Sequence, residues 1–449
     1  MQRLAIHNFG PIKDALIERN RLYVLIGPQS SGKSTIAKLV YFFLHVRDEV
    51  AAFIIETAQN GQIDGAGGRL RKRLTTRFVE FFGPAFQPPD VAIRCEYQNN
   101  YSLQIRLDEE RHRYVTLRFS AQMQQEIQRL LEDSAEKLKG KLETPGLIST
   151  VRRLASDQDR ALLLESVKKR CNDIFNYSKE LVFVPAGRSL LSTLSDQIQF
   201  IHPHLLDYPM RQFVEMVNST RVFFGRSLDD IIIERRVLST QPLSLAAVKK
   251  AQHYVRRILK GEYRYDKDGG KIFVNSRIYT KISYASSGQQ ESVWILLTLF
   301  LLVLGKSKAL VIIEEPEAHL FPDAQKEIME FIAFVFNEIE CDFLVTTHSP
   351  YVLASLNNLL YAKDLAMRGL ASPVGKVIPL ERWLSQHEVS GCFVGQGTID
   401  ALKSGDTAAL KTELLDTVSN SINNEYEKLL SIERGATRHQ NPVGARRYS

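Results

Sequence analysis

The chain has 449 residues, 44% of them apolar, and its 58 Lys and Arg against 51 Asp and Glu give a formal net charge of +7. This length and composition predict one large or two moderate domains with a substantial core. We find no apolar run of membrane-spanning length and no signal peptide in residues 1–10, so we expect a cytoplasmic protein with no membrane partner. The four scattered cysteines argue against a zinc site, and the mild positive charge permits but does not require nucleic acid.

The first predicted elements lead into a glycine-bounded turn. Two strands around Gly10-Pro11 precede an apolar strand over residues 22–26, and a helix is predicted from Ile36 to Leu44. A phosphate-binding loop stands between that strand and helix, formed by Gly27, Pro28, Gln29, Ser30, Ser31, Gly32, Lys33, Ser34 and Thr35. Its backbone N–H groups suit phosphate oxygens, Lys33 would reach the β- and γ-phosphates, and the Ser34 hydroxyl would bind Mg²⁺.

A basic cluster follows a glycine-rich stretch at residues 61–68, and consists of Arg69, Arg71, Lys72, Arg73 and Arg77. It is either a phosphate-binding surface or a solvated face. Three alternating runs between residues 91 and 119 predict an antiparallel sheet. Residues 120–179 predict a helical arm of two helices that is broken at Pro145-Gly146.

The second half of the chain predicts an α/β core. Residues 181–184 form a short strand, and a helical stretch runs from residue 208 to 259. Residues 262–279 resemble a hairpin, whose tip contains Asp266 and Asp268; we interpret this pair as turn residues rather than metal ligands. An apolar helix over residues 293–304 is followed by two buried strands over residues 309–313 and 343–346, which indicate a parallel sheet.

Charged side chains follow these two buried strands. Glu314 and Glu315 end the first strand, and His348 follows the second. Glu314 is placed to bind Mg²⁺, and Glu315 to act as the general base on the attacking water. His348 would hydrogen-bond the γ-phosphate or hold that water. The two strand ends therefore predict catalysis next to the phosphate-binding loop.

These motifs resemble those of the ATP-binding cassette (ABC) superfamily, in particular the ATPase heads of RecF, SMC and OLD-type proteins. The resembling segments are the loop from Gly27 to Ser34, the signature-like Ser286-Ser287-Gly288-Gln289-Gln290, the run from Glu314 to Leu320, and Thr347-His348-Ser349-Pro350. The resemblance implies ATP and Mg²⁺ as ligands and a two-lobed P-loop ATPase head of class α/β, with an inserted helical arm and a small C-terminal α+β extension. It also implies a head-to-head homodimer or higher oligomer.

In such a dimer, Ser286, Ser287, Gly288 and Gln289 of one subunit would complete the ATP site of the other. Glu314 stands where transporters have aspartate, which is similar to the OLD-like group. Gln87 and Gln98 are the candidates for the loop glutamine of the family. Arg188, in Pro185-Ala186-Gly187-Arg188, would either approach the nucleotide or the interface, or form a structural ion pair.

We predict four segments along the chain. Residues 1–119 form lobe one with the phosphate-binding loop, and residues 120–260 form the arm, from which the strand 181–184 returns to the core. Residues 261–375 form lobe two, and residues 376–449 a C-terminal extension with a basic tail. Within the extension we expect a strand pair near residues 393–399 and a helix from 410 to 432 with one packed face.

The resemblance also suggests a biological role. OLD-family nucleases carry a Toprim domain with an Asp-x-Asp pair, and no such pair follows His348. The chain is therefore most similar to stand-alone ATPases of anti-phage systems such as PARIS or Septu, which act with a separate effector nuclease. The alternative is a RecF-like or SMC-like ATPase in DNA repair that binds DNA itself. A transporter subunit is a third, weaker hypothesis, because the signature departs from the usual Leu-Ser-Gly-Gly-Gln.

Overall fold

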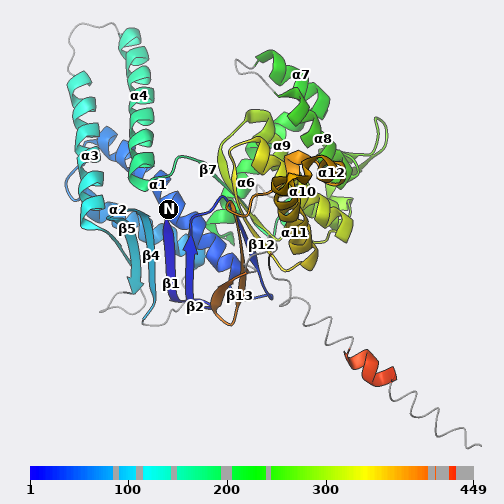
Figure 1. Cartoon of the computed structure of the whole chain (residues 1–449). Coiled ribbons are helices and arrows are strands. Elements are labelled where there is room, and N and C mark those ends of the chain that lie inside the picture. The colour runs from blue at the N-terminus through cyan, green and yellow to red at the C-terminus, as the bar shows by residue number, and fades with distance from the viewer. Residues whose placement is uncertain are drawn as a thin grey trace, which may run out of the picture.

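The computed structural model describes residues 1–83, 90–107, 115–142, 149–193, 205–238, 244–402, 410 and 424–430. Eleven of the described strands form one large sheet, shown in Figure 1, in the order β6-β5-β4-β1-β2-β14-β13-β3-β12-β11-β7. The predicted α/β class is confirmed. The bounds of these strands are β1 Arg3–Phe9, β2 Ile12–Glu18, β3 Leu22–Ile26, β4 Ala92–Gln98, β5 Tyr101–Leu107, β6 Val115–Phe119, β7 Glu180–Val184, β11 Ala309–Glu314, β12 Asp342–Thr347, β13 Val389–Gly395 and β14 Thr398–Ala401.

Helices cover both faces of this sheet. In β3, Val24 and Ile26 face one hydrophobic core and Leu25 faces the other, as the two-residue period of a strand requires. The first core contains α8, α9, α10 and α11, and the second contains α1, α2, α3 and α4. The helices are α1 Lys33–Asn60, α2 Ala66–Phe82, α3 Ala121–Leu142, α4 Ser149–Phe175, α5 Ser189–Thr193, α6 Tyr208–Arg221, α7 Leu228–Leu238, α8 Leu245–Leu259, α9 Ser287–Gly305, α10 Pro322–Glu338, α11 Pro350–Leu365 and α12 Ala371–Val377.

The two halves of the sheet differ in strand direction. Strands β13, β3, β12, β11 and β7 are parallel to one another, whereas β2, β1, β4, β5 and β6 pair antiparallel. The predicted antiparallel runs and the predicted strand at residues 181–184 are therefore confirmed. Figure 1 shows α3 and α4 standing side by side as an arm above the antiparallel half. The break predicted at Pro145-Gly146 lies outside the described residues.

Helix α1 is much longer than predicted. The sequence predicts it from Ile36 to Leu44, but it runs to Asn60 and ends at Gly61, which adopts a positive φ of 67°. No glycine or proline interrupts residues 36–60, so nothing in this stretch breaks the helix. Most of its residues are buried, because sheet and helices surround it.

The C-terminal strand pair lies inside the large sheet. Strand β13 pairs with β3, the strand that precedes the phosphate-binding loop, and β14 pairs with β2. The sequence predicts the pair but not this central place. Of the helix predicted over residues 410–432, residues 424–430 are described as helical, and Tyr426 and Leu429, predicted on a packed face, are exposed. That part of the prediction is wrong.

A separate three-stranded sheet contains the predicted hairpin. It consists of β8 Glu262–Asp266, β9 Gly269–Phe273 and β10 Tyr279–Lys281. Asp266 and Asp268 stand at its turn, and both accept hydrogen bonds from Lys271, so the interpretation as turn residues holds. Helix α9, behind this sheet, is apolar and long enough to span a membrane by composition, but 72% of its apolar window is buried in the core.

Candidate functional site

The phosphate-binding loop is held between β3 and α1. Ser30 and Gly32 adopt positive φ angles of 59° and 104°, and α1 begins directly after Gly32. A Cβ on Gly27 would come within 2.1 Å of the Val394 carbonyl oxygen in β13, so only glycine fits against that strand. The side-chain hydroxyl of Ser31 is buried without a hydrogen-bond partner. A free donor and the N-terminus of a long helix suit this loop for a phosphate group.

Lys33 folds back onto the loop. Its Nζ donates to the carbonyl oxygens of Gly27, at 2.8 Å, and Pro28, at 2.7 Å. Burial lowers the pKa of Lys33, and the carboxylates of Glu315 and Glu317 oppose that fall. The ammonium is therefore held by two neutral carbonyl groups close to an acidic cluster. Phosphate oxygens would be stronger acceptors for the same donor.

Glu314 and Glu315 lie where β11 ends. Strand β12 lies between β11 and β3, and all three are parallel, so their carboxyl ends meet at the phosphate-binding loop. Glu314 is 4% exposed; its Oε2 accepts from the Ala186 backbone N–H at 3.1 Å, and its Oε1 is buried without a partner. A buried carboxylate oxygen without a donor fits a cation ligand, so Glu314 and Ser34 suit Mg²⁺.

Glu315 and His348 face each other beside Glu314. Glu315 has a left-handed backbone with φ of 45°, which turns its side chain out of the strand direction. His348 Nδ1 lies 3.5 Å from Glu315 Oε1 and 3.6 Å from Glu317 Oε1. The His348 ring is 41% exposed and Glu315 29% exposed, so both reach an open surface next to the loop. The structure thus brings together the two residues predicted as catalytic.

Glu317 is a member of this cluster that sequence reasoning passed over as a site residue. It is 3% exposed, and its Oε1 accepts from Thr347 Oγ1 at 2.6 Å and from the His348 backbone N–H at 2.9 Å. It therefore fixes the backbone on which His348 stands. The signal that could have found it is its place two residues beyond Glu315 in the same motif.

Arg188 supports the backbone beneath the carboxylates. Its guanidinium is fully buried and donates to the carbonyl oxygens of Glu314 at 2.7 Å, Glu315 at 2.8 Å and Pro185 at 2.9 Å. Its Nε donates to the Glu291 carbonyl oxygen, and the Glu291 carboxylate lies 3.2 Å away. Burial lowers the pKa of Arg188, and Glu291 opposes that fall. Of the two predicted roles, the structural ion pair is the one observed.

The signature-like segment forms the start of α9. Ser286 caps this helix, since its hydroxyl accepts from the Gln289 N–H while the Gln289 side chain accepts from the Ser286 N–H. Ser287 is exposed, and Gly288 is required because a Cβ there would meet the His319 carbonyl oxygen at 2.9 Å. Among the described residues, the side chains of Gln289 and Gln290 bond to backbone at residues 259 and 282–285, away from the phosphate-binding loop.

Residues of the basic cluster and one candidate for the loop glutamine bond within the fold. In the basic cluster, Arg73 and Arg77 form ion pairs with the buried Glu49 of α1, so they bind the α2 helix to the core. Gln98, a candidate for the loop glutamine, donates to the carbonyl oxygens of Asp173 and Ile174 at the end of α4. The other candidate, Gln87, lies outside the described residues.

Comparison with known proteins supports a nucleotide-hydrolysing chain. A family model described as AAA ATPase domain matches residues 1–353. No curated protein matches the chain. The SMC head domain from Thermotoga maritima is 13% identical over 90% of this chain and 98% of that chain, with a TM-score of 0.35. An Smc head domain with an extended coiled coil, bound to the C-terminal domain of ScpA from Pyrococcus furiosus, is 12% identical over 94% and 99%, with a TM-score of 0.34.

Proposed function

Because this chain belongs to the AAA ATPase domain family and is an ATP hydrolase, we propose that it hydrolyses ATP with Mg²⁺ in an ABC-type site that two copies share. The observation that carries this proposal is that the signature-like helix start is exposed and that, among the described residues, it makes no hydrogen bond to the phosphate-binding loop. The phosphate-binding loop lies beside Glu314 and Glu315 at adjacent strand ends. The helix start at Ser286 and Ser287 is exposed, and the Ser286 hydroxyl bonds within its own cap, to Gln289. A second copy can bring that helix start to the open side of the loop.

The first half of the proposed site, from one copy, would bind the nucleotide and activate the attacking water. Lys33 would turn from the loop carbonyls to the β- and γ-phosphates, and Ser34 and Glu314 would hold Mg²⁺. When bound, Mg²⁺ neutralises charge on the phosphate oxygens. Glu315 takes the proton of the attacking water, and His348, fixed through Glu317, orients that water or the γ-phosphate. Because the side chains of Glu315 and His348 are both partly exposed, a water molecule can reach them from the open side of the loop.

The second half of the proposed site comes from the partner copy. Ser287 and Gly288 of that copy would present a hydroxyl and backbone N–H groups to the γ-phosphate, at a helix N-terminus. Closure of the two copies on each other would then depend on ATP bound in both. Nucleotide occupancy would therefore indicate whether the dimer has formed.

For the biological role, we propose a sensor ATPase of an anti-phage defence system that controls a separate effector nuclease through this closure. The motif resemblance supports this role. The DNA-repair alternative rests on the basic cluster and on the resemblance to RecF-like ATPases. It loses support because Arg73 and Arg77 are engaged with Glu49. Among the described residues of that cluster, only the charged groups of Arg71 and Lys72 form no ion pair and no hydrogen bond with a described residue.

The Glu315→Gln variant tests the reaction. Its turnover should fall about 100-fold or more, because the amide cannot take the proton, while ATP affinity stays within about threefold of wild type. Steady-state hydrolysis and equilibrium ATP binding measure the two effects. The exposed Glu338→Gln, at the end of α10, is the matched control. Unchanged turnover in Glu315→Gln would refute the assignment of the base.

The Glu315→Gln variant also tests the proposed role in anti-phage defence. In bacteria that carry this chain together with its neighbouring genes, phage plating should be restricted by wild type and unrestricted with Glu315→Gln. Restriction that persists without hydrolysis, or a neighbouring gene that encodes no nuclease, would count against the defence proposal and leave the ATPase proposal standing.

A further inference from the structure

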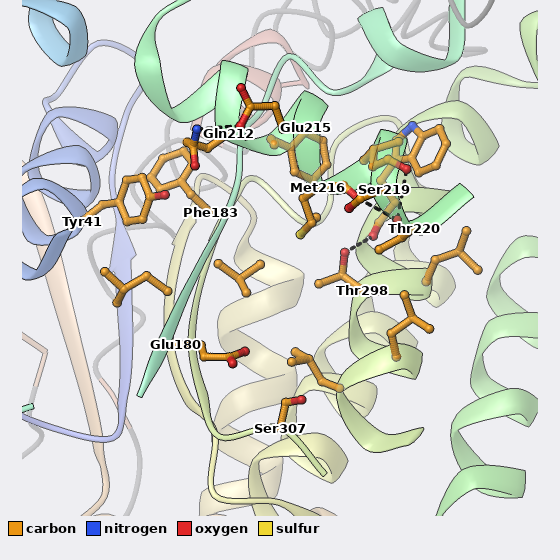
Figure 2. Close-up of a pocket in the computed structure, with 18 of the residues that line it drawn as sticks. Tyr41, Glu180, Phe183, Gln212, Glu215, Met216, Ser219, Thr220, Thr298 and Ser307 are labelled. Carbon is orange, nitrogen blue, oxygen red and sulfur yellow. Dashed lines mark hydrogen bonds between the residues drawn. The ribbon is translucent and has the colours of Figure 1, made fainter. Parts of the chain in front are cut away.

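A groove lies beside β7, the strand at one edge of the large sheet. It has a volume of about 580 Å³ and is bounded by β7, α6 and α9 (Figure 2). The carboxyl ends of β3, β11 and β12 and the phosphate-binding loop do not line it. The groove is therefore distinct from the candidate ATP site. Its volume lies in the range of binding pockets for small ligands and short peptide segments.

The groove follows the edge of β7 rather than one of its faces. Four consecutive residues line it, Glu180, Leu181, Val182 and Phe183. Leu181 and Phe183 pack against one hydrophobic core and Val182 against the other, so the groove meets side chains of both faces. Among the described strands, β7 pairs only with β11. Backbone N–H and C=O groups on its other side therefore face the groove without a strand partner.

The floor of the groove is apolar. Helix α9 contributes Trp294, Leu297 and Leu301, and α6 contributes Phe213 and Met216. Trp294 is anchored, because its Nε1 donates to Ser192 Oγ at 2.9 Å, in a helix that packs against the start of α9. The floor can therefore take apolar side chains at a fixed position.

The two ends of the groove are acidic. Figure 2 shows Glu180 at one end and Glu215 at the other. Neither carboxylate forms an ion pair with Lys or Arg in the described part of the chain; Glu215 accepts only from Gln212, at 2.9 Å. No Lys or Arg lines the groove, although the chain as a whole carries a net charge of +7. Basic side chains of an occupant would complement this local charge.

We propose that this groove binds an extended segment of a partner protein, which adds to β7 as a further strand. The backbone of the segment would bond to the free edge of β7, its apolar side chains would rest on α9, and Lys or Arg residues would meet Glu180 and Glu215. Four residues of β7 offer about 13 Å of edge, which accommodates four to five residues of an extended chain. Since α9 begins at the signature-like segment, the occupant contacts an element of the proposed ATP site.

Intrinsic fluorescence can test this proposal, because the chain has two tryptophans and Trp294 lines the groove. The Trp383→Phe protein, without ATP, is titrated with a synthetic peptide that alternates arginine and valine over five residues. We expect saturable binding with a change in Trp294 emission. In the Glu180→Gln/Glu215→Gln double variant the affinity should fall about tenfold or more. The Glu338→Gln variant, with an exposed glutamate outside the groove, should bind as wild type.

Further measurements test whether the peptide binds by adding a strand to β7. A peptide of the same sequence with alternate backbone nitrogens methylated should not bind, because it cannot pair with β7 on that side. Equal binding of the methylated peptide, or of the double variant, would overturn strand addition. No change in emission with the arginine–valine peptide, or a change only with small aromatic amines, would likewise overturn the proposal. These measurements need no hydrolysis, so they stand apart from the test of the ATPase site.

Discussion

At the scale of single residues, Arg188 is the positioning residue of the candidate site. Its donors hold the carbonyl oxygens of Glu314 and Glu315, and its Nε holds Glu291 in α9. It therefore joins the strand end that carries the carboxylates to the helix that begins with Ser287. We infer that a displacement of α9 would shift the backbone of Glu315, because Arg188 bonds to both.

The Arg188→Lys variant tests this role. Lysine keeps the charge but cannot serve four carbonyl groups with planar donors, so the backbone of Glu315 should lose its fixed position. We expect turnover to fall at least about tenfold with KM for ATP within about threefold, and the free energy of unfolding to fall by about 2 kcal/mol. Arg257→Lys is the matched control, because Arg257 is an exposed residue of α8 that forms an ion pair with Glu327 of α10. A loss of stability with unchanged kcat would mean that Arg188 serves folding alone.

Residue types predicted which side chains gather at the candidate site better than they predicted the contacts that hold those side chains in place. Glu314, Glu315 and His348 stand directly at strand ends, and Lys33 begins the helix that follows the phosphate-binding loop, so local pattern sufficed to group them. The partners of Arg188 lie at positions 185, 291, 314 and 315, and its role depends on how these segments pack. No local pattern encodes such a contact, and the sequence accordingly left its role open between nucleotide, interface and ion pair.

At the scale of elements, α2 is bound to α1 by a buried carboxylate. Glu49 in α1 is 5% exposed and accepts from Arg73 and Arg77, and the Arg77 guanidinium lies 4.1 Å from the ring centre of Tyr208 in α6. The basic residues that suggested a phosphate surface thus connect three helices. Sequence reasoning missed this because the glutamate lies 24 and 28 residues before its partners.

This ion-pair cluster predicts a pH dependence of stability. Burial alone would raise the pKa of Glu49, but hydrogen bonds from His45 and Arg73 and the charge of Arg77 outweigh it and lower the pKa to about 2. The folded state then binds fewer protons than the unfolded state, so the stabilisation is complete above the unfolded value of 4.5 and is lost as the pH falls towards about 2. It amounts to about 3 kcal/mol.

Denaturant titrations of wild type and Glu49→Gln measure this effect. At pH 7 the variant should be less stable by about 3 kcal/mol, and the difference should shrink below pH 4.5 as wild-type Glu49 becomes protonated. Glu136→Gln, an exposed glutamate on α3, serves as control. A difference that stays constant from pH 7 to pH 3 would show that Glu49 acts through packing and not through its charge.

At the scale of the whole molecule, the fold is one sheet with two different halves. Periodicity and strand-ending motifs predicted most strands of both halves and the helices of the arm, because each of these elements is a continuous segment. The place of β13 was not predictable in this way. It lies between β14 and β3, at the centre of the sheet, although more than 360 residues separate it from β3 in sequence. Its Val394 carbonyl packs against Gly27, so this late strand fixes one side of the phosphate-binding loop.

In the proposed dimer, each ATP site needs residues from two copies of the chain. Two variants that are inactive for different reasons provide the test: Glu315→Gln lacks the base, and Ser287→Arg blocks the helix start that its partner requires. In a mixed dimer, one site combines both defects, and the other combines Glu315 of one copy with Ser287 of the other.

The most direct measurement is ATP turnover of a one-to-one mixture of these variants, co-refolded or co-expressed so that copies exchange. If copies pair at random and sites act independently, half of the dimers are mixed and each has one intact site, so the mixture should recover about a quarter of wild-type turnover while each variant alone stays inactive. A mixture that forms mixed dimers, shown by differently tagged copies, yet remains as inactive as its components would contradict the shared site.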